Sequence, residues 1–307
     1  MSVDILMATY NGEKYLRNQI LSLQQQTYSD WVLWIRDDGS SDRTNLIVSE
    51  FAASDSRIRI VDEGRGKRLG VARNFLELTK YAKSPYVMFC DQDDIWFEKK
   101  LEKLVGFAER NFTDVLPCLV MCDGYGYSSE SGVITSDRVW LWYAKNLREF
   151  LFFNAGYQGC NVLFNAKLNE YLKTYRADYY YMHDDVASLI AHTFGRVFFL
   201  RDKLMLYRQH DANVTGNITT GFLQRVRLFF RKNAFVVSES HYREKESFLR
   251  AYGDEMSQEA RGLFAEYLSF TKRSLIKRLL LLHKNGFSLG GMYLPLYLKT
   301  IFRRPIG

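Results

Sequence analysis

Three aspartates within four positions are the residues of this sequence best suited to chemistry. Asp91, Asp93 and Asp94 directly follow the apolar, β-rich run 86–90. Carboxylates crowded at the end of a buried strand repel one another, so they need a cation, hydrogen-bond donors or protonation. Hard oxygen ligands suit Mg²⁺ or Mn²⁺ rather than zinc, and such an ion usually binds one or two carboxylates together with substrate phosphates. The cluster therefore predicts a metal site for a nucleotide diphosphate; the alternative is that these aspartates only cap the next helix.

A second pair of carboxylates, Asp37 and Asp38, follows another apolar run, 31–35. The stretch DDGSSD at 37–42 is also a good turn and helix-capping sequence. This pair taken alone does not indicate function, so its meaning depends on where the fold places it.

Short strands and helices alternate through the first third of the chain. Apolar, β-rich runs predict strands, and apolar residues at helical spacing predict the helices between them. The expected strands are 3–8, 31–35, 57–61 and 86–90, and the expected helices lie around 15–23, 46–51, 71–81 and 99–110. This alternation is typical of parallel strands joined by right-handed crossovers in a doubly wound sheet. Because loops after the carboxyl ends of such strands form the ligand crevice, residues 9–11, 37–39 and 91–94 should converge there.

The pattern is less regular between about 115 and 207. Strands are expected at 116–122 and 133–134 around a Gly/Tyr/Ser turn, at 161–164, and at 196–200 and 203–207, with a helix at 183–194. Beyond residue 216 the sequence becomes helical and basic. The predicted organisation is a catalytic body of residues 1–220 followed by a basic helical region of residues 221–307.

The charge is divided between these two parts. The 307 residues carry 42 Lys and Arg against 35 Asp and Glu, a formal +7. Residues 1–199 hold 23 basic and 26 acidic side chains, whereas residues 200–307 hold 19 and 9. A uniformly basic nucleic-acid-binding protein would not show this division, so no nucleic acid is expected as a partner. The 47% hydrophobic content excludes a disordered chain, and four cysteines without a CxxC pair indicate reduced, buried thiols.

Three stretches of the C-terminal part combine apolar and cationic faces, namely 222–237, 275–282 and 293–304. Such helices lie in an anionic membrane interface, or they pack on the body or on a second subunit of a homo-oligomer. No uncharged apolar run approaches about 18 residues, and the first residues do not have the pattern of a signal peptide. We therefore expect a cytoplasmic protein that is peripheral on the inner face of the cell membrane.

Four ordered motifs resemble those of inverting family 2 glycosyltransferases with the GT-A fold. They are MATYNGEKYL (7–16), WVLWIRDDGSSDRT (31–44), YVMFCDQDDIWFEKKL (86–101) and YMHDDVASLIA (181–191). The variant FCDQDDIW, with HDD downstream and then YRQHDANVTG (207–216), is similar to bacterial rhamnosyltransferases of surface polysaccharide synthesis. The resemblance covers residues 1 to about 216. It implies a GT-A type doubly wound mixed sheet with a helical basic C-terminal region.

The resemblance also implies roles for individual residues. Asp184, in HDD, matches the catalytic base, and Asp185 is the alternative. Asp91 and Asp93 match the DxD motif that binds the metal, Mg²⁺ or Mn²⁺. His210 falls where many GT-A enzymes place a histidine or basic residue near the metal and the diphosphate.

Contacts with the nucleotide sugar are expected at the three strand ends. The resemblance places Thr9 and Asp38 in the nucleoside pocket, with Asp38 meeting the pyrimidine base. Arg73 would reach the diphosphate from the start of its helix, or it is simply solvated. The stretch 64–68 resembles a mobile basic loop near phosphates. The full expected set is Thr9, Tyr10, Asn11, Asp38, Arg73, Asp91 and Gln92.

The donor and acceptor follow from the resemblance alone. It favours transfer of L-rhamnose from dTDP-rhamnose to a lipid-linked bacterial surface polysaccharide, with a UDP-hexose or UDP-N-acetylhexosamine as alternative donors. The family's common acidic residue before the base is His183 here, and the QxxRW motif of processive synthases is absent. That absence favours addition of one or a few sugars. Among other classes, a non-catalytic membrane-surface scaffold is an alternative, while a phosphatase with Asp91 as nucleophile would need its motif on the first strand.

Overall fold

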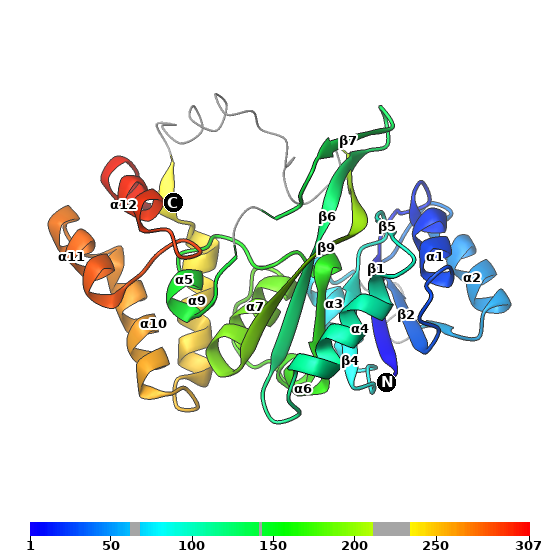
Figure 1. Cartoon of the computed structure of the whole chain (residues 1–307), viewed down its shortest axis with the longest axis horizontal. Helices are drawn as coiled ribbons and strands as arrows, with labels where there is room; N and C mark the ends of the chain where they lie inside the picture. The colour runs from blue at the N-terminus through cyan, green and yellow to red at the C-terminus, as the bar shows by residue number, and fades with distance from the viewer. Residues whose placement is uncertain (62–67, 141–142, 211–233) are drawn as a thin grey trace.

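A nine-stranded mixed sheet forms the centre of the computed structural model, which describes residues 1–61, 68–140, 143–210 and 234–307 (Figure 1). The strands are hydrogen-bonded in the order β3-β2-β1-β4-β8-β6-β9-β5, and β7 pairs with β6. They are β1 (Val3–Thr9), β2 (Trp31–Asp37), β3 (Ile58–Ile60), β4 (Tyr86–Cys90), β5 (Ile95–Trp96), β6 (Cys118–Ser128), β7 (Val133–Ser136), β8 (Val162–Asn165) and β9 (Arg196–Gln209). The predicted α/β class with a mixed sheet is confirmed.

The parallel strands of the N-terminal half end level with one another. β1 pairs in parallel with β2 and β4, and β2 pairs in parallel with β3. In this register Thr9 lies beside Asp37, and Met7 lies beside both Ile35 and Cys90. The loops that follow therefore open at one edge of the sheet, as the sequence predicted. The helices of this half are α1 (Leu16–Gln24), α2 (Thr44–Ser54), α3 (Val71–Thr79) and α4 (Lys100–Asn111).

Two long strands differ from the sequence-based expectation. β6 continues to Ser128 through the stretch expected to form a Gly/Tyr/Ser turn, and β9 is one strand where two were expected. The two strands pair in parallel over most of their length, with register shifts between Met121 and Asp123 and between Asp123 and Tyr125. Such bulges let a long strand bend without ending, so the polar residues that suggested a turn and a break are accommodated within the pair.

The helix α7 (His183–Phe194) begins and ends where the sequence predicted. The short elements before it are α5 (Leu147–Phe150), a 3₁₀ turn (Gly159–Asn161) and α6 (Ala166–Lys173). Because β4 pairs with β8 in the antiparallel sense and β8 pairs likewise with β6, the second half of the sheet joins the first without a parallel crossover.

Four helices and two short strands make up the described C-terminal region. They are β10 (Phe235–Val237), α9 (Glu239–Tyr252), α10 (Gln258–Phe270), α11 (Leu275–Asn285), α12 (Tyr293–Phe302) and β11 (Arg304–Ile306). β10 and β11 form a separate parallel pair. Most of the helix expected at 222–237, and the predicted boundary at 220, lie outside the described residues. The last part of that stretch is strand rather than helix, because Phe235 and Val237 pair with β11.

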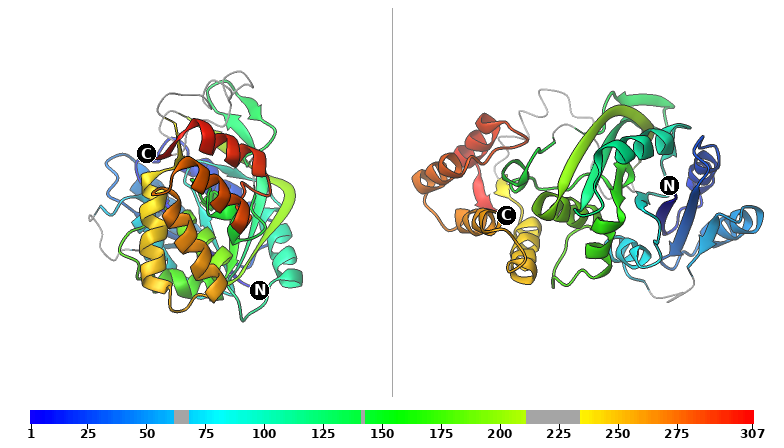
Figure 2. Two further views of the ribbon diagram at one scale, coloured as in Figure 1. Left: turned by 90° about the vertical axis from the view of Figure 1, so that its left-hand side faces the viewer. Right: turned by 60° about the horizontal axis from the view of Figure 1, so that its bottom comes forward.

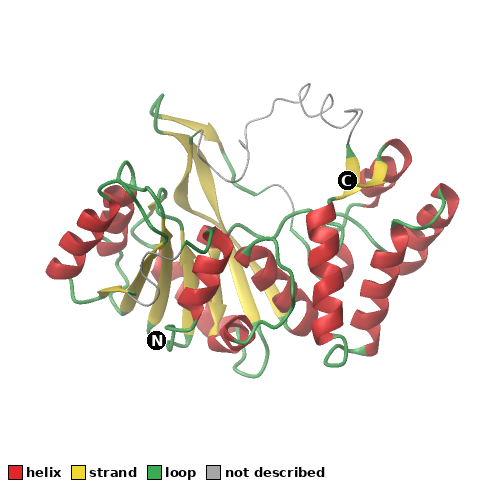
Figure 3. Ribbon diagram, turned by 180° about the vertical axis from the view of Figure 1, so that it is seen from behind, coloured by secondary structure: helices red, strands yellow, loops and turns green. Residues whose placement is uncertain are grey.

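The C-terminal helices continue the hydrophobic core on one side of the sheet. One cluster of buried residues joins Phe89 and Val186 of the sheet side to Phe248, Phe264 and Leu282 of the C-terminal helices. Figures 2 and 3 show α9 to α12 standing together at the end of the molecule opposite α1 and α2. A second cluster lies around α1, α2 and α4 on the other side of the sheet. Within the described residues, no helix combines the length and the apolar character needed to cross a membrane.

Candidate functional site

The loops after β1 and β4 are joined by the side chain of Gln92. Its Oε1 accepts a hydrogen bond from the backbone N–H of Tyr10 (3.0 Å), and its Nε2 donates to the carbonyl of Tyr10 (3.0 Å). Gly12 leaves room for this amide, since a Cβ there would lie 2.3 Å from Gln92 Oε1. Gln92 and Tyr10, both predicted to contact the nucleotide sugar, are thus brought together, and Gln92 fixes the shape of this edge.

The loop after β2 is organised by Asp37. Its carboxylate accepts hydrogen bonds from the Thr9 hydroxyl (2.9 Å) and from the backbone N–H of Ser40 (2.7 Å). Asn11 adopts a positive φ of 46° and its Oδ1 accepts from the N–H of Ser41 (2.9 Å). The turn-forming alternative therefore accounts for Asp37. Thr9 is buried beneath the same loop.

Asp38 is buried and holds the chain that leads into α3. Its carboxylate accepts from the backbone N–H groups of Leu69 (2.7 Å) and Gly70 (2.8 Å), and Arg36 lies 3.3 Å away. Arg73 is exposed on the first turn of that helix. Residues 64–67 of the expected basic loop lie outside the described residues. The structure thus gives Asp38 a defined role in shaping the edge of the site.

A side-chain contact links that segment back to the first strand. The guanidinium of Arg68 lies 4.2 Å from the centre of the Tyr10 ring, which is 38% exposed. An aromatic face with a cation over it offers both a flat apolar surface and a positive charge. Such a pair suits a ligand that has a ring and phosphates.

The carboxylates after β4 form a tight group with a buried cysteine. One ligand atom each from Asp91, Asp94 and Cys160 lie within 4.8 Å of one another. Burial, and then repulsion by Asp93 and Asp184, raise the pKa of Asp91 to about 7. Burial and the neighbouring carboxylates also raise the pKa of Asp94 well above its usual range. A divalent cation would relieve this repulsion, and the two carboxylates are the hard oxygen donors that Mg²⁺ or Mn²⁺ prefers. The Cys160 sulfur is not such a donor, and burial raises the pKa of its thiol well above the usual range.

A buried lysine that the sequence analysis missed stands beneath this group. Lys100 is 0% exposed; its Nζ donates to the carbonyl of Cys160 (2.7 Å) and lies 3.9 Å from the Trp96 ring centre. Its positive charge lowers the pKa of both Asp91 and Asp94, against the larger effect of burial. The available signal is a lysine on the first turn of the helix after the acidic cluster, to which the sequence analysis assigned no role.

Asp93 points toward the end of β9. Its Oδ2 lies 2.8 Å from Nε2 of His210, and the His210 ring lies 4.9 Å from that of Tyr15. Arg208 donates from Nε to the backbone carbonyl of Asp93 (2.6 Å) and lies over the same tyrosine ring. The structure therefore places His210 against the second aspartate of DxD. A carboxylate and an imidazole in contact are suitable donors for a divalent cation.

Asp184 lies on the first turn of α7 and faces this group. Its side chain accepts from the backbone N–H of Gly159 (3.1 Å) and of Asp185 (3.0 Å). Burial, and then the charge of Asp185, raise the pKa of Asp184 to about 8. The charge of Asp184 in turn raises the pKa of Asp91, so the predicted base and the predicted metal ligand lie within electrostatic range. A carboxyl whose pKa is near neutrality can accept and release a proton at physiological pH.

The neighbours of Asp184 face elsewhere. Asp185 is buried, and its Oδ2 lies 3.0 Å from Nε2 of His241 on α9. His183 is also buried, with its ring stacked on Phe75 (3.9 Å between centres). Burial lowers the pKa of His183 to about 3, so it acts as a neutral aromatic ring in the core. Of the three residues HDD, Asp184 is the one directed toward the acidic cluster.

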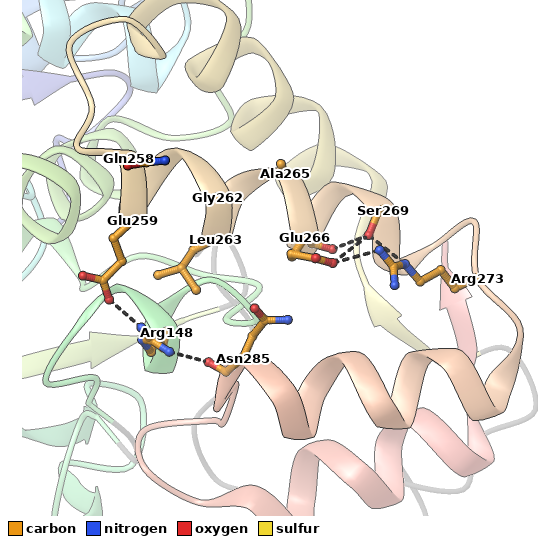
Figure 4. Close-up of a pocket in the computed structure, with 10 residues that line it drawn as sticks. All are labelled: Arg148, Gln258, Glu259, Gly262, Leu263, Ala265, Glu266, Ser269, Arg273 and Asn285. Carbon is orange, nitrogen blue, oxygen red and sulfur yellow. Dashed lines mark hydrogen bonds and ion pairs between the residues drawn. The ribbon is translucent and has the colours of Figure 1, made fainter.

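A groove of about 490 Å³ lies away from these carboxylates, among the C-terminal helices (Figure 4). It contains the ion pairs Arg148–Glu259 (2.5 Å) and Arg273–Glu266 (2.9 Å). Surface ion pairs of this kind contribute little to stability and do not by themselves mark a site. Its described lining includes none of the residues predicted to act on a nucleotide sugar.

Comparisons with known proteins agree with this geometry. Residues 4–172 match Glycosyl transferase family 2. The dTDP-rhamnosyl transferase RfbG of Shigella flexneri is 32% identical over 223 residues, which are 68% of this chain and 73% of RfbG. The UDP-Glc:alpha-D-GlcNAc-diphosphoundecaprenol beta-1,3-glucosyltransferase WfgD of Escherichia coli is 40% identical over 109 residues. That match spans 36% of this chain and only 42% of WfgD.

Solved structures share the fold at low sequence identity. The crystal structure of S. aureus TarS 1-349 in complex with UDP-GlcNAc superposes with a TM-score of 0.56 and 15% identity, over 98% of this chain and 90% of that one. The mannosyltransferase PcManGT from Pyrobaculum calidifontis, in complex with GDP-Man and Mn2+, gives a TM-score of 0.53 at 15% identity, over 98% of this chain and 84% of that one. The chain therefore has the GT-A fold and belongs to Glycosyl transferase family 2.

Proposed function

We propose that this protein is an inverting, metal-dependent glycosyltransferase with Asp184 as its catalytic base. The observation that carries the proposal is the position of Asp184 beside the acidic cluster. Its Oδ2 accepts from the N–H of Gly159, and the next residue, Cys160, lies with Asp91 and Asp94. An inverting transfer is a single in-line displacement, which needs a base for the acceptor and charge stabilisation for the leaving group. The site contains candidates for both.

The proton would move from the acceptor hydroxyl to the carboxylate of Asp184. As that oxygen bonds to the anomeric carbon, the bond between this carbon and the diphosphate oxygen breaks, and the nucleotide leaves with the electron pair. The pKa of Asp184, raised to about 8 by burial and then by Asp185, makes it a stronger base than an ordinary carboxylate. Asp185 is the alternative base, but its side chain contacts His241.

The metal site would be formed by Asp91 and Asp93, with His210 beside them. The proximity of Asp91 to Asp94 and the contact of Asp93 with His210 support this choice. A bound Mg²⁺ or Mn²⁺ would supply positive charge to stabilise the departing diphosphate. The protein's own contribution is to hold these donors at the end of β4.

The donor would bind along the same edge of the sheet. Tyr10, Asn11 and Gln92 shape the loops after β1 and β4, and Thr9 and Asp38 support them from below. We assign the base-binding position to Asp38, following the family resemblance. We assign the diphosphate contact to Arg73, which is exposed on the first turn of α3. Because the carboxylate of Asp38 already accepts from Leu69 and Gly70, its effect on the base would include shaping the pocket wall.

The donor sugar is best assigned as L-rhamnose, from dTDP-rhamnose. The similarity to RfbG over 73% of its length supports that choice, and a UDP-hexose or UDP-N-acetylhexosamine is the alternative, supported by the name of WfgD. That name also includes a diphosphoundecaprenol. We therefore propose a lipid-linked acceptor in the synthesis of a bacterial surface polysaccharide.

The C-terminal helices would place the protein on the cytoplasmic face of an anionic membrane. Ile276 is 72% exposed, Leu280 62% and Leu294 68%. Residues 272–307 include eight Lys and Arg and no Asp or Glu. Exposed apolar side chains in a segment with eight cationic and no acidic residues of its own favour an interface with anionic lipids. The alternative is that these exposed side chains contact a second subunit.

Transfer assays with the variant Asp184→Asn test the proposal. Wild-type protein, Mg²⁺ and a lipid-linked acceptor are incubated in turn with dTDP-rhamnose, UDP-glucose and UDP-N-acetylglucosamine. We expect the wild-type protein to form product from one of these donors. In the variant, kcat should fall by at least about 10³-fold, since general-base catalysis contributes 10²–10⁴-fold. Nucleotide binding by the variant should be unchanged. Asp178→Asn, at an 81% exposed side chain, is the matched control. Undiminished transfer by Asp184→Asn would remove Asp184 as the base.

A further inference from the structure

Asp185 is tied to the C-terminal helices rather than to the nucleotide side of the site. Its Oδ2 lies 3.0 Å from Nε2 of His241, and the two side chains are only 6% and 5% exposed. The other ring nitrogen, Nδ1, contacts the hydroxyl of Ser238, which also accepts from the backbone N–H of His241. When that hydroxyl donates to Nδ1, the proton of the neutral ring lies on Nε2 and faces Asp185. A continuous chain of contacts thus runs from the start of α9 to the first turn of α7.

The same helix holds the segment that leads into Asp184. Backbone N–H groups of this segment donate to side chains along one face of α9. The bonds are Arg176 to the Tyr252 hydroxyl (3.1 Å), Tyr179 to the Ser247 hydroxyl (3.0 Å) and Tyr181 to Glu244 Oε1 (2.9 Å). Residues 176–185 are therefore fixed by α9 side chains at four positions, counting the His241 contact.

The backbone at Gly156 also packs closely against Asp185. A Cβ on Gly156 would lie 2.5 Å from Asp185 Oδ1 and 2.6 Å from its Cα. Asp185 is therefore close to the Gly156 backbone through Oδ1 and to His241 through Oδ2. Since close-packed interiors transmit small displacements, removing His241 frees this turn to shift on the side of α9.

The start of α9 is itself anchored. Asn154 accepts from the N–H of Ser238 (3.0 Å) and donates to the carbonyl of Val236 (2.9 Å). Strand β10, directly before the helix, pairs with β11, and Glu239 N–H donates to the carbonyl of Gly307 (2.9 Å). His241 therefore projects from a fixed support and not from a free helix end.

We propose that His241 is a positioning residue for the catalytic base: it holds Asp185 from α9, and thereby sets the direction in which Asp184 faces the acceptor. The inference rests on the proposed function, because it takes Asp184 as the base. It assigns the C-terminal region a part in the reaction, in addition to any part in membrane contact.

The kinetic test compares His241→Ala with His241→Gln. Misplacing a reacting group by about 1 Å can cost 10²-fold in rate, so we expect His241→Ala to lower kcat by about 10²-fold with the donor KM unchanged. Glutamine carries an Nε2 donor that can reach Asp185, so His241→Gln should recover at least tenfold. Tyr242→Phe, which removes only a hydrogen bond to the Leu268 carbonyl, is the control on the same helix and should stay within twofold.

A second measurement needs no substrate. Hydrogen–deuterium exchange of the peptide covering residues 179–188 should become faster in His241→Ala, return toward wild type in His241→Gln and stay unchanged in Tyr242→Phe. Unchanged exchange in His241→Ala overturns the positioning role. Faster exchange with unchanged kcat overturns the link to catalysis. If the wild-type protein transfers no sugar from any donor, the proposed function fails, while exchange still decides whether His241 holds this turn.

Discussion

The N-terminal strands and the C-terminal helices support different parts of the candidate site, and they do so in different ways. The strands position Asp91, and the helices support Asp184. Asp91 follows a strand whose position is set by the main-chain register of β1 and β4. Asp184 begins a helix whose lead-in segment is held by side chains of α9, such as Glu244 and Ser247. Main-chain pairing tolerates most side-chain changes, whereas side-chain support does not. The position of Asp184 should therefore be more sensitive than that of Asp91 to substitutions outside the site.

The largest expected effect concerns whether the two regions fold together. Phe248 of α9 is 0% exposed and belongs to the same core cluster as Phe89. We expect Phe248→Ala to lower the free energy of unfolding by about 3–5 kcal/mol, measured by urea denaturation followed by both fluorescence and circular dichroism. Ile276→Ala, at a 72% exposed residue of α11, should change it by less than about 0.5 kcal/mol. Two separate transitions, only one of them shifted, would mean that the C-terminal helices fold independently.

The next effect concerns the proposed metal site at the end of β4. Asp93→Ala removes the carboxylate that contacts His210, and we expect Mg²⁺-dependent nucleotide binding to weaken at least about 100-fold, since losing even an outer-shell partner costs 10–100-fold. Isothermal titration with and without Mg²⁺ measures this. Asp202→Ala, which removes a surface ion pair with Lys103, is the control. If the Mg²⁺ dependence survives in Asp93→Ala, the ion is bound elsewhere.

A smaller effect is expected on the pH dependence of stability, to which both Asp91 and Asp184 contribute. The pKa values of Asp91 and Asp184 are raised to about 7 and about 8, so in the folded protein each binds its proton more tightly than in the unfolded chain. Their contribution to stability is fully present below about pH 4 and is lost as the pH rises through 7 and 8. The pKa of buried His183 is lowered, so this residue destabilises the folded protein as the pH falls below about 6.5. The effect of the two carboxyl groups is therefore best measured between pH 6.5 and 8.5.

Thermal unfolding without divalent cations should report this loss. We expect Tm to fall by several degrees from pH 6.5 to 8.5, since each kcal/mol moves Tm by about 2–4 °C in a chain of this size class. Added Mg²⁺ should raise Tm more at pH 8.5 than at pH 6.5, because the carboxylates must be ionised to bind it. Asp184→Asn should flatten the profile. A Tm that rises from pH 6.5 to 8.5 would contradict the raised pKa values of Asp91 and Asp184.

The smallest expected effect is on membrane association. Ile276→Ser combined with Leu294→Ser should reduce flotation with phosphatidylglycerol vesicles about tenfold, because partial immersion of two such side chains contributes roughly 1.4 kcal/mol. Leu46→Ser, at a 57% exposed residue of α2, should leave flotation unchanged. Equal flotation of both variants would favour contact with a second subunit, which sedimentation would then reveal.

The strands that could be predicted from the sequence share one property. Each is an apolar run that ends at turn-forming residues. Trp31–Asp37 and Tyr86–Cys90 are examples, and their parallel register placed the acidic clusters at one edge. The order of strands in the second half could not be predicted, because antiparallel β8 inserts between β4 and β6 through contacts distant in sequence.

The support of the site was missed for a different reason. The buried face of α9 carries His241, Glu244, Lys245 and Ser247, which in a sequence look like solvent-facing residues. Lys100 was missed for the same reason: a lysine on an amphipathic helix is normally exposed, whereas this one is 0% exposed. Residues that are polar and buried are recognisable only when their partners are known, and here the partners come from other segments.

The pairing of β10 with β11 also bears on the order in which the protein becomes active. Residues 238–303, which include all of α9 to α12, lie between the two strands. Chains leave the ribosome from the N-terminus at about 5–20 residues per second. The ends of β1, β2 and β4 can therefore form well before Ile306 has been synthesised. The support for Asp184 is complete only when β11 reaches β10. A nascent chain would thus complete the strand ends before it completes the contacts that hold the turn carrying Asp184.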